Sequence, residues 1–77
     1  LSPEYLSRIF KKELGVSLIE YITHVKMEAA QGLLAHSDLS VGQISDRLGY
    51  GNFAYFSQLF RIHFGITPTE FRKSIRP

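Results

Sequence analysis

A stripe of side chains between residues 54 and 61 has the composition of a surface that reads nucleic-acid bases. Four residues follow the spacing i, i+3, i+4 and i+7, which aligns them along one side of a helix: Ala54, Ser57, Gln58 and Arg61. An Arg side chain can pair with guanine O6 and N7, and a Gln side chain can pair with adenine N6 and N7. The alternative is a plain solvated helix face, because any exposed helix presents polar residues to water.

A second copy of this stripe lies fifty positions earlier. The segment 5–21, YLSRIFKKELGVSLIEY, aligns with the segment 55–71, YFSQLFRIHFGITPTEF. Five aligned pairs are identical: Tyr5 and Tyr55, Ser7 and Ser57, Phe10 and Phe60, Gly15 and Gly65, Glu20 and Glu70. On the same arc the first copy carries Glu4, Ser7, Arg8 and Lys11, beside Lys12. A solenoid needs about three repeats to be stable, so we infer two similar modules instead.

Capping signals divide the chain into five predicted helices, over 3–14, 18–35, 41–48, 53–64 and 68–75. Residues that favour the N-cap precede each of them: Ser2 before Pro3, then Ser17, Ser40, Asn52 and Thr67. Glu or Gln follows Ser17, Ser40 and Thr67 three residues later, which is the pattern of a capping box. No stretch alternates apolar and polar residues as a strand does, so the predicted fold class is all-α.

The aromatic residues of 53–64 are expected to form the core. On a helical wheel one face contains five side chains: Tyr55, Phe56, Leu59, Phe60 and His63. Three more lie at the borders of that face: Phe53, Ile62 and Phe64. Burial of each ring should contribute about 2–3 kcal/mol to stability.

The last part of this pattern matches a helix-turn-helix. Helix 41–48 and helix 53–64 are joined by a Gly-Tyr-Gly turn, where Gly49 and Gly51 suit positive φ or a close approach of the backbone. In such a motif the second helix enters the major groove of DNA. The long helix before it would span about 27 Å. Since successive major grooves on one face of DNA lie about 34 Å apart, that helix could hold two recognition helices in neighbouring grooves.

Composition excludes several other functions. The chain has 77 residues, a net charge of +2 and no Cys, so thiol chemistry and thiolate metal sites are excluded. No apolar run has the length of a membrane span, and the beginning does not resemble a signal peptide, so we expect a cytoplasmic protein. The three histidines, His24, His36 and His63, do not have the spacing of metal ligands. The sequence also contains no catalytic triad order and no phosphate loop. We expect no metal, no cofactor and no enzymatic activity.

Two long runs resemble the C-terminal DNA-binding domain of AraC/XylS-type bacterial transcription regulators: LSPEYLSRIFKKELGVSLIEYI and LSVGQISDRLGYGNFAYFSQLFRIHFGITPTEFR. The resemblance covers essentially all of 1–77 and implies a homeodomain-like bundle of about five helices. It implies a first recognition helix in 1–16, a linker helix in 17–36 and a second helix-turn-helix unit in 37–77. Because members of the family have two further helices ahead of the first recognition helix, it also implies that the first unit is truncated at its N-terminus.

The resemblance implies roles for particular residues. The residues implied to face bases are Phe53, Ala54, Ser57 and Gln58, and in the first copy Glu4, Ser7 and Arg8. Those implied to address phosphate are Arg61, Lys11, Lys12, Ser2 and Asn52. For Asn52 the simpler role is the helix cap, and Phe53 could either contact a thymine methyl group or border the core.

The main alternative is a protein-interaction or dimerisation module, which would show a contiguous apolar surface patch. The partner implied by the resemblance is double-stranded DNA, with RNA polymerase as a further candidate. No membrane and no small-molecule ligand is expected for this segment, and dimerisation is assigned to a domain outside it. Three basic residues near the end are expected to form a solvated tail: Arg72, Lys73 and Arg76. Alternatively, they contact phosphate or stabilise a helix C-terminus by their charge.

Overall fold

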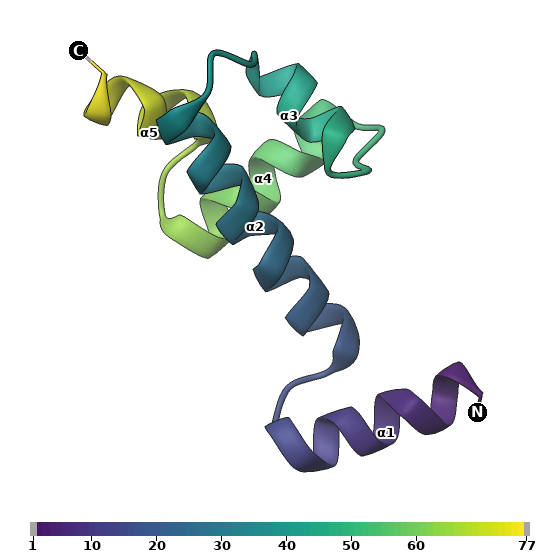
Figure 1. Ribbon diagram of the computed structural model, residues 1–77. Helices are drawn as coiled ribbons and strands as arrows, with labels where there is room; N and C mark the ends of the chain where they lie inside the picture. Colours follow the sequence, from purple (N-terminus) through teal and green to yellow (C-terminus); the bar gives the residue numbers. More distant parts are fainter. Residues whose placement is uncertain (1, 77) are drawn as a thin grey trace.

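The computed structural model describes residues 2–76 and contains five helices (Figure 1). They are α1 (Pro3–Leu14), α2 (Leu18–His36), α3 (Val41–Arg47), α4 (Phe53–Phe64) and α5 (Pro68–Ile75). The predicted all-α class is confirmed, and each predicted boundary is correct to within one residue. The outer ends of the predicted segments, at Leu1 and Pro77, lie outside the described residues. Within residues 2–76, no helix combines the length and the apolar content needed to cross a bilayer.

Local capping bonds begin the helices where the sequence predicts. The Ser2 hydroxyl accepts a hydrogen bond from the Tyr5 N–H (3.1 Å). Full capping boxes begin α3 at Ser40 and α5 at Thr67. Hydrogen bonds from Thr67 lower the pKa of the Glu70 carboxyl in the second box.

The predicted capping box at Ser17 is only half formed. Its hydroxyl accepts from the Glu20 N–H (3.0 Å), which is the first of the two bonds. The second bond, from the Ser17 N–H to the Glu20 carboxylate, is not formed, and Glu20 lines a surface hollow with Tyr21 and His24.

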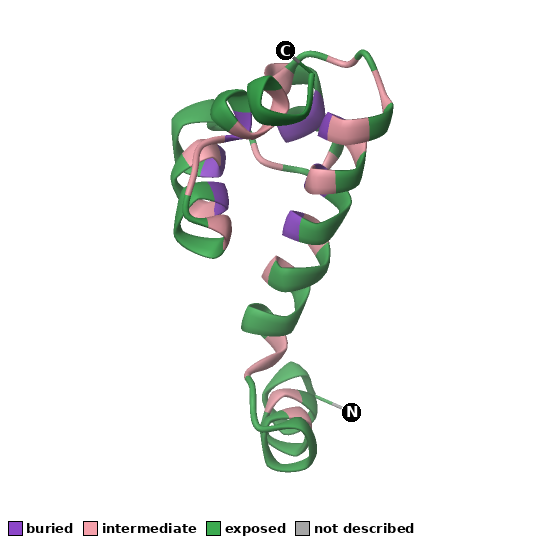
Figure 2. Cartoon of the chain, turned by 90° about the vertical axis from the view of Figure 1, so that its left-hand side faces the viewer, coloured by how far each residue is buried: buried purple, intermediate pink, exposed green. Residues whose placement is uncertain are grey.

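The core packs around the C-terminal half of α2 and leaves α1 outside it (Figure 2). The core cluster consists of six fully buried residues: Met27, Ala30 and Leu34 from α2, Ile44 from α3, and Phe56 and Phe60 from α4. No residue of α1 is buried. The ring of Phe10 contacts the ring of Tyr21, with 5.1 Å between centroids, and so holds α1 against the start of α2.

The prediction that all the α4 aromatic residues form the core is wrong for part of that face. Phe56 and Phe60 are buried, but Tyr55 is 55% exposed, and His63 is also exposed. Besides Phe56 and Phe60, α4 contributes only the partly buried Leu59 and Phe64 to the packing against the described core. Tyr55 therefore packs at the rim, with its ring 6.2 Å from the ring of Tyr50.

The turn between α3 and α4 is held by a buried hydroxyl. Ser45 is 1% exposed, and its Oγ donates a hydrogen bond to the backbone oxygen of Tyr50 (3.1 Å). Gly49 has φ of +88°, which confirms the prediction for that glycine, whereas Gly51 has no positive φ. Lys26 of α2 places its Nζ 5.0 Å from the centroid of the Tyr50 ring and so ties the turn to α2.

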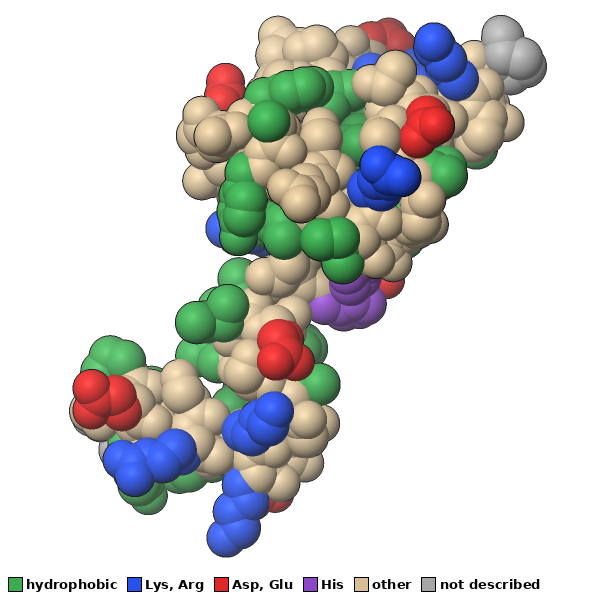
Figure 3. Space-filling model, turned by 180° about the vertical axis from the view of Figure 1, so that it is seen from behind, with side chains coloured by type: hydrophobic (Ala, Val, Ile, Leu, Met, Phe, Trp, Pro, Cys, Tyr) green, Lys and Arg blue, Asp and Glu red, His purple; other side chains and the backbone are tan. Residues whose placement is uncertain are grey.

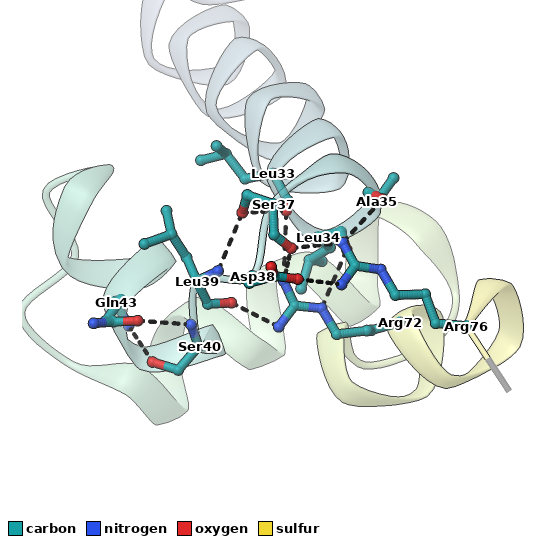
Figure 4. A network of polar contacts seen from close by, with 10 residues as sticks. All are labelled: Leu33, Leu34, Ala35, Ser37, Asp38, Leu39, Ser40, Gln43, Arg72 and Arg76. Carbon is teal, nitrogen blue, oxygen red and sulfur yellow. Dashed lines mark hydrogen bonds and ion pairs between the residues drawn. The ribbon is translucent and has the colours of Figure 1, made fainter.

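Two arginines of the C-terminal segment close the end of α2 (Figure 4). Arg72 donates from Nε to the Leu34 oxygen (3.1 Å) and from its guanidinium to the Leu39 oxygen (2.6 Å) and the Ser37 oxygen (3.2 Å). Arg76 donates to the Ala35 oxygen (3.0 Å). The expectation of a solvated tail is wrong for these two residues, because the last carbonyls of a helix lack partners within it. Both guanidinium groups instead bond to carbonyls at the C-terminal end of another helix, α2, while Lys73 is exposed.

Candidate nucleic-acid interface

The stripe on α4 faces away from the core. Ala54, Gln58 and Arg61 are exposed, and Ser57 is half-buried. On the other side of the same helix, Phe56 and Phe60 are fully buried and fix its rotation. Phe53, the first residue of α4, is 50% exposed, so its ring reaches solvent beside the stripe. The stripe therefore faces solvent rather than the core.

Asn52 is the N-cap of α4, which confirms the simpler of its two predicted roles. Its Oδ1 accepts a hydrogen bond from the Tyr55 N–H (3.0 Å). This bond uses the acceptor of the side-chain amide, whereas the two donors of the NH₂ group are not consumed by the cap.

The first copy of the stripe is also on the surface. Ser7 is half-buried. The charged members are all exposed: Glu4, Arg8, Lys11 and Lys12. Pro3, Glu4, Ser7 and Arg8 line a shallow hollow at the start of α1. The two copies thus present the same arc of their helices to solvent, although α1 lacks the core that fixes α4.

α2 lies between the two stripes. α1 lies at the N-terminal end of α2, and α4 crosses the C-terminal half (Figure 1). The longest dimension of the molecule is 46 Å. This exceeds the repeat of the major groove along one face of DNA, about 34 Å. Figure 3 shows Lys and Arg side chains on both lobes of one face, with acidic side chains among them.

The phenol of Tyr50 stands at the turn that precedes the exposed stripe. Burial, and then the proximity of Tyr55, raise the pKa of Tyr50. The phenol is therefore neutral at physiological pH and adds no negative charge beside the stripe.

Two histidines that are far apart in the sequence lie together in the structure. His24 of α2 and His63 of α4 lie with Nδ1 and Nε2 3.0 Å apart. Their separation of 39 positions matches no ligand motif, so only the crossing of α2 and α4 reveals the pair.

Comparison with known proteins identifies the family. A family model described as a helix-turn-helix domain matches residues 1–74. The Msm operon regulatory protein of Streptococcus mutans is 41% identical over 76 residues, which are 99% of this chain and 27% of that protein.

Solved structures agree with this match. A transcriptional regulator from Chromobacterium violaceum, described by its AraC-type DNA-binding domain, is similar with a TM-score of 0.87 at 33% identity, over 99% of this chain and 68% of that one. The DNA-binding domain of AdpA, solved in complex with a target DNA, has a TM-score of 0.91 at 26% identity, over 99% and 68%.

The chain spans only part of the proteins it matches, 27%, 20% and 25% of the length of the first three curated relatives. Within that part the fold agrees with the matched structures. The chain belongs to the helix-turn-helix family of AraC-type DNA-binding domains of transcription regulators.

Proposed function

We propose that this domain binds double-stranded DNA in a sequence-specific manner, with α4 in one major groove and α1 in the next. The observation that carries the proposal is the rotation of α4. The buried Phe56 and Phe60 turn Gln58 and Arg61 outward, on a helix that follows a helix-turn-helix turn. One chain with two different stripes would read an asymmetric site rather than a palindrome.

The proposed contacts divide into two kinds. Base edges are assigned to seven side chains at the N-terminal halves of the two helices: Phe53, Ala54, Ser57 and Gln58 of α4, and Glu4, Ser7 and Arg8 of α1. Phosphate oxygens are assigned to Arg61, Lys11, Lys12, Ser2 and Asn52. Ser2 and Asn52 suit this role because their caps use acceptor atoms, and their hydroxyl and amide donors can face phosphate.

We further propose that 1–16, 17–36 and 37–77 act as first recognition helix, linker and second helix-turn-helix unit. Six apolar residues on α1 and early α2 are exposed: Tyr5, Leu6, Ile9, Ile19, Ile22 and Val25. Helices outside this segment would cover them and complete the first unit. RNA polymerase is a candidate partner, and dimerisation is assigned to a segment outside this chain.

A selection of random duplexes at two salt concentrations tests the proposed function. The domain should enrich one asymmetric sequence, with two preferred blocks about one helical turn apart. The affinity for that sequence should fall steeply with added salt, because contacts to phosphate release counterions.

The exposed apolar residues of α1 favour a second candidate, a protein-interaction module. In that case the selection would enrich no sequence, and binding to a protein partner would respond little to salt. The selection therefore separates the two functions.

A further inference from the structure

Two histidines from different helices meet at the surface between α2 and α4. Nδ1 of His24 lies 3.0 Å from Nε2 of His63, and the centroids of the two rings are 5.0 Å apart. Both residues are exposed, and they line an open hollow together with Glu20, Tyr21 and Thr23. The pair is therefore accessible to solutes, and it belongs to neither proposed DNA-binding stripe.

The short distance restricts what these nitrogens can hold. When one of the two nitrogens carries its proton, the contact is an N–H···N hydrogen bond. When neither nitrogen does, the two lone pairs repel unless a cation beside them binds both. A metal ion about 2.0–2.1 Å from each nitrogen, the usual distance for imidazole on Zn²⁺, would subtend an angle of about 94°. Ligands near a right angle suit the tetragonal geometry of Cu²⁺ or Ni²⁺.

Glu28 supports the required orientation of His24. Its Oε1 lies 3.5 Å from the other ring nitrogen, Nε2, one turn along α2. A carboxylate in this place favours the proton on Nε2 and leaves the Nδ1 lone pair directed at His63. Histidines that bind metals commonly have such a carboxylate behind them.

We propose that His24 and His63 bind one divalent transition-metal ion of the Ni²⁺ or Cu²⁺ class, through Nδ1 and Nε2 respectively. Among the described residues, no group of three or more His, Cys, Asp or Glu side chains could hold a metal ion together. The site therefore supplies two protein ligands, and water completes the coordination. The ion would tie α2 to α4, since one ligand belongs to each helix.

Thermal unfolding of the untagged domain with increasing NiCl₂ tests this proposal. The Tm should rise with the Ni²⁺ concentration, because the folded state alone brings the two ligands together, and EDTA should reverse the rise. MgCl₂ at the same concentrations should leave the Tm unchanged, because Mg²⁺ prefers oxygen ligands.

Three histidine variants provide a matched set. His24→Ala and His63→Ala should each abolish the Ni²⁺-dependent rise in Tm, whereas His36→Ala should keep it. His36 is exposed at the end of α2 and serves as the control for unspecific binding by a single imidazole. Glu28→Gln should weaken Ni²⁺ binding by about 10-fold or more.

Retention of the rise in either His24→Ala or His63→Ala, or its loss in His36→Ala, would overturn the proposal. A second measurement does not depend on variants that fold. Zn²⁺, which is diamagnetic, should shift the imidazole ¹⁵N resonances of His24 Nδ1 and His63 Nε2 together in the native chain. Shifts at one histidine alone, or equal shifts at all three, would exclude a site shared by α2 and α4.

Discussion

Gln58 and Arg61 lie on the same exposed stripe of α4, but they differ in what they can recognise. A Gln amide can bond both to adenine N6 and to N7, so it distinguishes one base pair from the others. We expect Gln58→Ala to cost about 1–3 kcal/mol of binding free energy on the preferred duplex and to relax the preference at one position. Arg61→Ala should weaken all duplexes about equally and reduce the salt slope by about one.

Competition binding with a set of single-position duplex variants measures both effects. Lys73→Ala is the matched control, because it removes one exposed positive charge from α5, outside both stripes. An equal loss on every duplex for Gln58→Ala would assign Gln58 to phosphate rather than to a base. A loss confined to one base pair for Arg61→Ala would reverse its assignment in the same way.

At the scale of the element, α2 contains a glycine that its structure does not require. Gly32 is exposed in the helix, and a Cβ atom there would meet nothing within 4 Å. Gly32→Ala should therefore stabilise the domain by about 1 kcal/mol, because Ala loses less backbone entropy in a helix. Gly49→Ala is the contrasting variant. Its φ of +88° should make the same substitution destabilising by about 1–2 kcal/mol. Urea unfolding of the two variants should give midpoints on opposite sides of the parent.

The end of α2 depends on a side chain from another element. Arg72 of α5 donates to the backbone oxygens of Leu34, Ser37 and Leu39 through its planar guanidinium. A Lys ammonium also has three donors, but they leave a single nitrogen and do not reproduce the planar fork of the guanidinium, whose three nitrogens each bond to a different oxygen. We expect Arg72→Lys to destabilise the domain by about 1.5–3 kcal/mol, the range for hydrogen bonds to a charged group.

Chemical denaturation of Arg72→Lys beside Lys73→Ala measures this contribution. The exposed Lys73 should be neutral to within about 0.5 kcal/mol. If Arg72→Lys left the free energy of unfolding unchanged, the positive charge alone, and not the three hydrogen bonds, would stabilise the end of α2.

The whole molecule shows which features the sequence could predict. Helix boundaries follow from residues within one turn of each other, such as Ser40 with Gln43, so local reading located them. The contacts of Arg72 and the pairing of His24 with His63 join positions more than thirty residues apart. They depend on how α2, α4 and α5 cross, which no local pattern encodes. The sequence does not predict the exposure of Tyr55 either, because an apolar helix face does not show how much of it the neighbouring helices will cover.

The two copies of the repeat differ in how firmly the rest of the molecule holds them. Phe10 and Phe60 occupy equivalent positions, yet Phe60 is fully buried and Phe10 is only half-buried, on a helix with no buried residue. Phe60→Ala should cost about 3–5 kcal/mol and destabilise the whole domain. Phe10→Ala should instead increase the hydrogen exchange of α1 amides and leave the exchange of α3 and α4 amides unchanged, because α1 lies outside the core.

Addition of the selected duplex should then slow exchange in α1 of the parent chain more than in α4, since DNA would supply the contacts that the core does not. Exchange of α1 amides as slow as that of α4 amides in the free domain would contradict this difference between the copies. A duplex that protects α4 but leaves α1 unchanged would restrict reading to one major groove. The hydrogen-exchange pattern thus tests directly whether both copies of the stripe engage DNA in this chain.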